Sequence, residues 1–290
     1  MKWRDARRST NVDDRRGRSP MGLGGGGMKL GLGGTVVLLV VGMIFGINPL
    51  EMLGLMSQVQ QGAPQTQQDP TAPPADDEAS QFVAAILGET EDVWGQVFQQ
   101  NGAQYPVPRL VLFSGAVQSA CGGASAAVGP FYCPADQQVY IDLSFFEQME
   151  ARLGGGGDFA QAYVIAHEVG HHVQTVTGVS EKVNAVRMRG GSVEGADGLL
   201  VRQELQADCY AGLWANHAQQ RHSWLEPGDL EEALRTATAI GDDTLQRQGQ
   251  GHVVPDSFTH GSAEQRVRWF RTGWESGDIR ACDTFAARSL

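Results

Sequence analysis

The feature that most constrains this chain is the motif His-Glu-Val-Gly-His at residues 167–171. It lies in a largely apolar stretch, residues 162–175, that predicts a buried α-helix. Residues four apart lie on one face of a helix, so His167 and His171 present two imidazoles at the spacing that one zinc ion accepts. Glu168 lies about 100° around the helix, which suits a base that takes a proton from a metal-bound water.

A chance occurrence of the motif is the alternative, because the chain contains 7 histidines among its 290 residues. The apolar surroundings argue against chance, since buried His and Glu side chains cost free energy unless they are paired or bound to a metal. A zinc ion would give all three side chains a partner. The motif therefore predicts a zinc site.

A second predicted helix, beginning near residue 199, carries candidates for the remaining roles. Catalytic zinc sites usually have three protein ligands and leave the fourth position to water. Glu204 and Asp208 are four residues apart and therefore share one helix face. One carboxylate can bind zinc, and the other can accept the far N–H of a ligating histidine and fix its tautomer. An ordinary solvated acidic pair is the alternative, and the apolar residues around the two carboxylates weaken it.

The order H-E-x-x-H and then E-x-x-x-D resembles the gluzincin metallopeptidases. The segments AHEVGHHVQ, QELQADCYAG and FTHGSAEQRVRWF resemble the bacterial membrane-anchored neutral zinc metallopeptidases of the YpfJ type, over roughly residues 80–285. The resemblance implies that His167, His171 and Glu204 bind zinc, that Glu168 is the general base, and that Asp208 supports a ligating histidine.

We expect an α+β fold, a mainly helical, zincin-like metalloprotease domain with a small β-sheet. Helices are predicted at residues 78–101, 144–153, 181–189 and 227–250, and strands at residues 110–113 and 138–143. The Gly-, Ala- and Ser-rich residues 115–134 are predicted to form a loop. In zincins, as the resemblance implies, an extended peptide lies along an edge strand before the metal helix. Residues 138–143 are our candidate for that edge, with an interior strand as the alternative.

His260 precedes a capping box, Ser262 with Gln265, that predicts the start of another helix. A zinc peptidase needs a donor for the oxyanion that forms as water attacks the carbonyl, and His260 or Arg266 could provide it. The alternative is a structural histidine in a turn and an arginine paired with a carboxylate. We retain His260 as a candidate catalytic residue.

The N-terminal part of the chain predicts a membrane anchor. Residues 30–50 contain no charged side chain, and as a helix of about 30 Å they would match the hydrocarbon core of a bilayer. Residues 1–29 contain 8 basic and 3 acidic side chains, and positive flanks stay cytoplasmic. The expected fold class therefore includes one N-terminal transmembrane helix and a disordered linker. A buried core helix and a cleaved signal peptide are the alternatives.

The corresponding domains are a basic cytoplasmic tail (1–29), a transmembrane anchor (30–50), a flexible linker (51–77) and a zinc metallopeptidase domain (78–290). This places a single-pass protein in a bacterial inner membrane with its catalytic domain outside. The four cysteines fit an oxidising compartment. Cys121 and Cys133 flank a loop and predict a local disulfide. Cys209 and Cys282 remain as a second pair, with a buried free thiol at Cys209 as the alternative.

These features predict a membrane-anchored zinc endopeptidase that acts on a peptide or protein substrate. Outside residues 1–29 the chain has 14 basic and 30 acidic side chains, which argues against nucleic-acid binding because phosphate contacts need a cationic surface. One alternative is a non-enzymatic zinc-binding scaffold of the cell envelope, which would have no use for Glu168. The other is a zinc hydrolase of a non-peptide amide.

Overall fold

The computed structural model describes residues 1–17, 77–153 and 157–290. This part of the chain is a mixed α/β domain. The described α-helices are α3 (Glu78–Gln100), α4 (Ser144–Leu153), α5 (Asp158–Val176), α6 (Val179–Met188), α7 (Leu199–His222), α8 (Asp229–Ala239), α9 (Asp242–Gln250) and α10 (Ala263–Ser276). The described strands are β1 (Val12–Asp14), β2 (Arg109–Phe113), β3 (Ala116–Ser119), β4 (Gly122–Ser125), β5 (Phe131–Cys133) and β6 (Gln138–Asp142).

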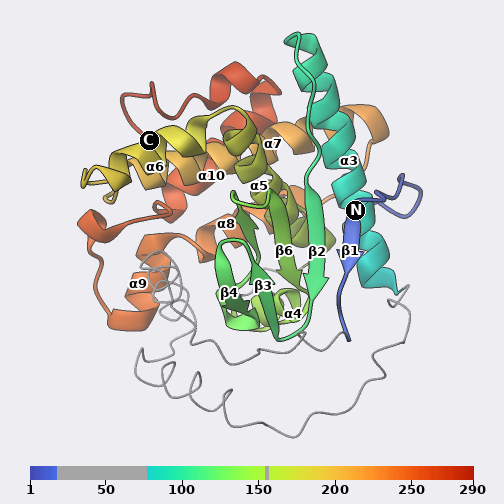
Figure 1. Cartoon of the computed structure of the whole chain (residues 1–290), viewed down its shortest axis with the longest axis horizontal. Helices are drawn as coiled ribbons and strands as arrows, with labels where there is room; N and C mark the ends of the chain where they lie inside the picture. Colours follow the sequence, from blue (N-terminus) through green and yellow to red (C-terminus); the bar gives the residue numbers. More distant parts are fainter. Residues whose placement is uncertain (18–76, 154–156) are drawn as a thin grey trace, which may run out of the picture.

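One sheet has the strand order β1-β2-β6-β5, and Figure 1 shows β1, β2 and β6 side by side in it. β1 and β6 each run parallel to β2, whereas β5 runs antiparallel to β6. β6 is therefore an interior strand, so the structure selects the alternative that we left open for residues 138–143. The short strand β5 lies at the edge instead.

The region predicted as a loop contains a hairpin. β3 and β4 pair antiparallel, and a disulfide joins Cys121, in the turn, to Cys133 on β5, as predicted. The sequence did not predict these strands because they are short and rich in Gly, Ala and Ser, which have low strand propensity.

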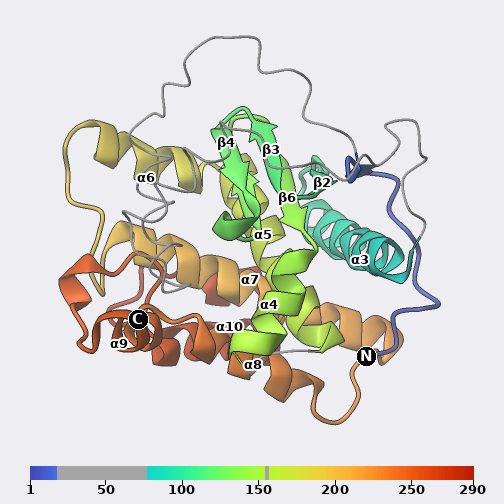
Figure 2. The same cartoon turned by 90° about the horizontal axis from the view of Figure 1, so that it is seen from below.

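The helices form the larger part of the domain, and α5 lies between the sheet and α7 in Figure 2. α10 crosses α7 at two glycines. A Cβ atom on Gly273 would lie 1.9 Å from the carbonyl oxygen of Cys209, and one on Gly212 would lie 2.0 Å from that of Phe270. The two helices can approach this closely only because neither position has a side chain.

Residues 1–17, predicted to be part of a basic cytoplasmic tail, are folded against the domain. β1 shares backbone hydrogen bonds with the β2 region, including Arg15 N–H to the carbonyl of Leu112 at 2.8 Å. Trp3 is 3% exposed, and its Nε1 donates to Asp158 at 3.0 Å. Three arginines of this segment pair with acidic side chains of α3 and its N-cap: Arg4 with Glu78, Arg7 with Glu91 at 2.8 Å, and Arg16 with Asp77 at 2.9 Å.

The predicted fold class and location are therefore wrong in their membrane part. Among the helices that the structure describes, none combines the length and the apolar character needed to cross a bilayer. Residues 30–50 and the linker up to residue 76 lie outside the described residues. A single crossing between residues 17 and 77 would put β1 and β2 on opposite sides of a membrane, yet the two strands are paired. Arginines of the N-terminal segment instead form ion pairs with acidic side chains of the domain.

The expected helix over residues 227–250 is two helices, α8 and α9, separated at Gly241. A Cβ atom on this glycine would lie 2.4 Å from the backbone nitrogen of Ala263, so the break brings the chain against the start of α10. The break also places Asp242 at the beginning of α9, where its carboxylate contacts the loop that carries His260.

Candidate metal centre

The three predicted ligands converge between α5 and α7. Nε2 of His167 lies 3.2 Å from Oε2 of Glu204, and Nε2 of His171 lies 3.4 Å from the same oxygen. One ligand atom from each of the three residues falls within 4.8 Å of the others. Gly170 allows the two helices to approach, because a Cβ atom there would be 3.1 Å from the backbone of Ala207.

Both histidines are oriented through their other ring nitrogen. Nδ1 of His167 lies 2.8 Å from Oδ1 of Asp208, and Nδ1 of His171 lies 2.9 Å from Oε1 of Gln174. An N–H at Nδ1 that donates to these oxygens leaves Nε2 free to bind a metal. Two imidazole nitrogens and one carboxylate oxygen are a donor set of catalytic zinc sites, so the residues present fit a zinc ion.

Asp208 is buried and fully paired. Its carboxylate accepts hydrogen bonds from the Tyr163 hydroxyl at 2.6 Å and from Nε and Nη2 of Arg266 at 2.9 and 3.0 Å. Burial raises the pKa of Asp208, but Arg266 and His167 outweigh it and hold the pKa at about 2. Arg266 is 4% exposed and committed to this pair. The alternative that we considered for it, pairing with a carboxylate, is therefore the one that the structure supports.

The acidic side chains of the site favour positive charge on the neighbouring imidazoles. Burial lowers the pKa of His167, but Asp208 and Glu204 raise it to about 10. Burial alone would raise the pKa of Glu204, yet the two histidines hold it well below its usual range. Glu168 is 8% exposed, and burial raises the pKa of its carboxyl. A metal ion entering this site would therefore displace protons from the imidazoles.

His260 lies in the loop before α10, and Asp242 holds that loop. Oδ2 of Asp242 accepts hydrogen bonds from the backbone N–H groups of Thr259, His260 and Gly261 at 2.8, 2.7 and 2.9 Å. Oδ1 of Asp242 lies 3.4 Å from Nδ1 of His260. The charges of His260 and Glu204 influence each other's pKa, which places His260 within electrostatic range of the centre.

Two supporting residues, Gln174 and Asp242, were missed by the sequence analysis. Gln174 follows His171 by three residues on one helix, which is a visible signal of a shared face. Asp242 follows Gly241, and the pair is compatible with a helix start, a signal that our prediction of one long helix overlooked. His172 points away from the centre, since its Nδ1 lies 3.0 Å from the Tyr132 hydroxyl and its Nε2 contacts the carbonyl of Pro106.

The fold brings His167, His171 and Glu204 together as a candidate metal centre of the two-histidine, one-carboxylate class. The chain belongs to the family described as "Putative neutral zinc metallopeptidase", whose model matches residues 1–285. This confirms the family resemblance and extends it to the N-terminal segment. Zinc is accordingly the cofactor, and the family implies peptide or protein substrates.

Proteins of Escherichia coli and Mycobacterium tuberculosis are similar in sequence to this chain. The chain is 50% identical over 289 residues to the uncharacterized protein YpfJ of Escherichia coli K12, covering 98% of this chain and 99% of that protein. It is 43% identical over 223 residues to the uncharacterized protein Rv2575 of Mycobacterium tuberculosis H37Rv, covering 73% of this chain and 74% of that one. No solved structure matches the chain.

Proposed function

We propose that this protein is a zinc-dependent endopeptidase with His167, His171 and Glu204 as ligands and Glu168 as general base. The observation that supports it best is the convergence of two Nε2 atoms and Oε2 of Glu204 beside a buried carboxyl. Zinc, when bound, would lower the pKa of a water molecule and polarise the substrate carbonyl. Glu168 would accept the proton and pass it to the leaving amine, and its raised pKa suits this role.

His260 is the proposed donor to the substrate carbonyl oxygen as negative charge develops there. Burial lowers its pKa, but the Asp242 carboxylate and the charge of Glu204 raise it above the ordinary value of histidine. The raised pKa favours the doubly protonated imidazole, the form that can donate while positively charged. Asp242 positions it by holding both the ring and the backbone of its loop.

The edge strand β5 replaces residues 138–143 as our candidate for binding the substrate backbone. It runs antiparallel to β6, and Tyr132 on it contacts His172 of α5, the neighbour of a proposed ligand. A strand at the edge of a sheet can pair with an extended peptide through its backbone groups. This arrangement supports hydrolysis of an internal bond in an unfolded chain.

Metal removal tests the proposed function. We expect a chelator to abolish cleavage of an unfolded protein such as casein, because the three ligands would then hold protons in place of the metal. Addition of about one equivalent of zinc should restore cleavage, whereas magnesium should not, because it prefers oxygen ligands. Cleavage that continues in rigorously metal-free protein would contradict the proposal.

The pH dependence of activity tests the role of His260. A histidine whose pKa is raised stays protonated to higher pH, so we expect the alkaline fall of kcat/KM to lie above pH 6.5, the ordinary value. Asp242→Asn removes the charge that raises this pKa while an amide oxygen remains for the backbone N–H groups. The alkaline fall should then move to lower pH.

The matched control for this measurement is Asp243→Asn. Asp243 follows Asp242 in the first turn of α9, and its carboxylate accepts a hydrogen bond from the backbone N–H of Ala263 at 2.7 Å. This variant should leave the alkaline fall of kcat/KM where it is in the wild type. An unchanged profile in Asp242→Asn would remove His260 from the mechanism.

A further inference from the structure

The second ligating histidine is oriented by an amide instead of a carboxylate. Gln174 is fully buried, and its Oε1 lies 2.9 Å from Nδ1 of His171. Its amide nitrogen faces two acceptors, the carbonyl of Gln203 at 2.6 Å and Oε1 of Gln206 at 3.1 Å. Because the nitrogen has acceptors on its side, the oxygen is directed to His171.

The chain of amides continues into the C-terminal segment. Gln206 is 5% exposed, and its Nε2 donates to the carbonyl oxygen of Cys282 at 3.0 Å. This contact directs the oxygen of Gln206 toward Gln174. From His171 to Cys282, each N–H therefore donates to the next oxygen in one direction, and the last acceptor is a backbone carbonyl.

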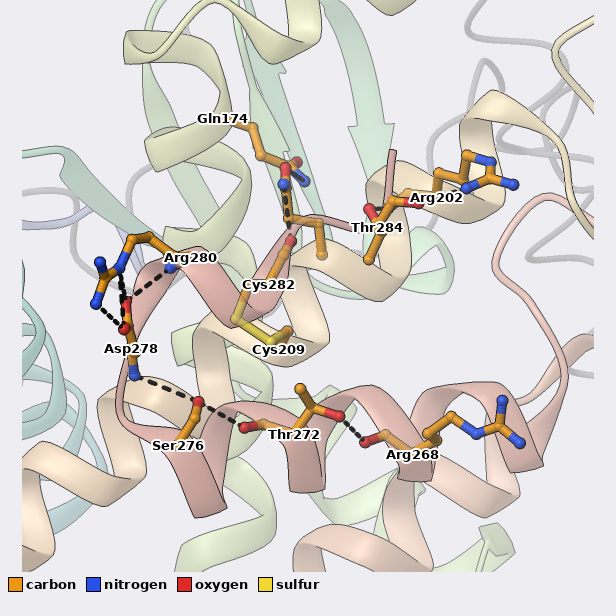
Figure 3. The surroundings of a disulfide bond; sticks show 11 residues. Gln174, Arg202, Cys209, Arg268, Thr272, Ser276, Asp278, Arg280, Cys282 and Thr284 are labelled. Atoms are coloured by element: carbon orange, nitrogen blue, oxygen red, sulfur yellow. Dashed lines mark hydrogen bonds and ion pairs between the residues drawn. A yellow bond between two sulfur atoms is a disulfide. The ribbon is translucent and has the colours of Figure 1, made fainter. Parts of the chain in front are cut away.

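The position of that carbonyl depends on the second disulfide, which joins Cys209 of α7 to Cys282 and excludes a free thiol at Cys209 (Figure 3). Both cysteines are fully buried. The hydroxyl of Thr284 donates to the carbonyl of Arg202 at 2.6 Å, and Nη1 of Arg202 donates to the carbonyl of Ala287 at 3.0 Å. The segment around Cys282 is thus fastened to α7, the helix that carries Gln206 and Glu204.

The two histidines differ in what fixes their tautomer. Asp208 is a carboxylate, which can only accept a hydrogen bond when ionised, so it specifies an N–H at Nδ1 of His167 by its chemistry. Gln174 has an acceptor and a donor end, so it specifies the tautomer of His171 only while its amide keeps one orientation. If the amide turned, Nδ1 would accept and the proton would lie on Nε2, the atom that must bind zinc.

We infer that Gln174 and Gln206 are positioning residues for His171, and that the Cys209–Cys282 disulfide anchors them by holding the Cys282 carbonyl. The inference rests on the proposed zinc site and adds to it a chain of hydrogen bonds that connects the C-terminal segment to His171. The quantity that this assembly controls is the affinity for zinc.

The experiment measures zinc dissociation constants of the full-length chain by competition with a chromophoric chelator. Gln174→Met should weaken zinc binding about 10- to 100-fold, the range known for partners of metal ligands. Gln206→Met and the double variant Cys209→Ala/Cys282→Ala should each weaken zinc binding by up to about 10-fold, the lower end of this range. The effect should be smaller because the Gln203 carbonyl still accepts a hydrogen bond from the Gln174 amide. Absorption of the cobalt-substituted protein should change in the same variants, since a disordered imidazole alters the coordination.

Two variants serve as matched controls. Gln220→Met makes the same change at an exposed position near the end of the same helix, where the side chain donates to Oδ1 of Asn216 at 2.7 Å. Cys121→Ala/Cys133→Ala removes the other disulfide. Both controls should bind zinc as tightly as the wild type does. The melting temperature of each metal-free variant shows whether a loss of zinc affinity comes from a loss of folding.

The outcomes separate this inference from the proposed function. A wild-type protein that binds no zinc would contradict the proposed function itself. Wild-type zinc binding with unchanged affinity in Gln174→Met and Gln206→Met would overturn the inference alone. If the cysteine double variant does not fold, Gln206→Met still tests whether the link to Cys282 matters.

Discussion

Glu168→Gln is expected to lower kcat/KM for peptide cleavage by about 10²- to 10⁴-fold, the usual contribution of a general base. Glutamine has nearly the same shape but cannot take a proton at neutral pH. The contacts that orient the proposed ligands, His167 with Asp208 and His171 with Gln174, do not involve Glu168. The variant should therefore still bind one zinc ion per chain.

The measurement is bound zinc and casein cleavage, side by side, in wild type and variant. The matched control is Glu275→Gln, which makes the same chemical change at an exposed position near the end of α10 and should leave cleavage unchanged. Equal cleavage by zinc-loaded Glu168→Gln would show that another group is the base. Zinc binding without cleavage in either protein would favour the scaffold alternative.

The sequence predicted which candidate side chains share a helix face, because the signals for this are local. Residues four apart share a helix face whatever the rest of the fold does, so His167 with His171 and Glu204 with Asp208 could be paired from spacing alone. The capping box at Ser262 is equally local, and the structure has it. The contact between the two helices was the only non-local step, and the apolar residues around both motifs indicated it.

The N-terminal segment could not be placed from its sequence. Basic residues before an apolar stretch favour a cytoplasmic tail, and the same charges also favour ion pairs with an acidic domain. β1 has three residues, too few for a recognisable alternation, and its partner β2 lies far along the chain. Only the folded structure shows that Trp3 is buried and that Arg7 binds Glu91.

The supporting residues were missed for a different reason. Gln174 could be placed on the face of His171, but an amide at that spacing resembles any surface glutamine until α7 is known to cover it. Arg266 could be assigned either to the oxyanion or to a carboxylate, and the choice depends on where α10 crosses α7. Such roles are set by contacts between helices, which spacing along one helix does not contain.

Arg266→Met is expected to lower the free energy of unfolding by about 3–5 kcal/mol, the cost of removing one partner of a buried ion pair. Asp208 is fully buried and Arg266 is 4% exposed, so solvent cannot replace the lost guanidinium. The measurement is urea unfolding of the metal-free protein near pH 7. Arg247→Met is the control, because that side chain is 63% exposed and its ion pair with Asp243 lies at the surface, where such pairs contribute about 0–1 kcal/mol.

Urea unfolding at different pH values tests whether the charge of Asp208 causes this destabilisation. In the wild type the pKa of Asp208 lies at about 2, below its ordinary value of 3.8. A lowered pKa in the folded state gives stability that is present above pH 3.8 and is lost as the pH falls toward 2. Without Arg266 the folded-state pKa rises, so the deficit of Arg266→Met should shrink as the pH falls through this range. Asp208→Asn/Arg266→Met should recover part of the loss at pH 7, because it removes the buried carboxylate that has lost its arginine. A double variant as unstable as Arg266→Met would show that lost packing, and not the charge of Asp208, causes the destabilisation.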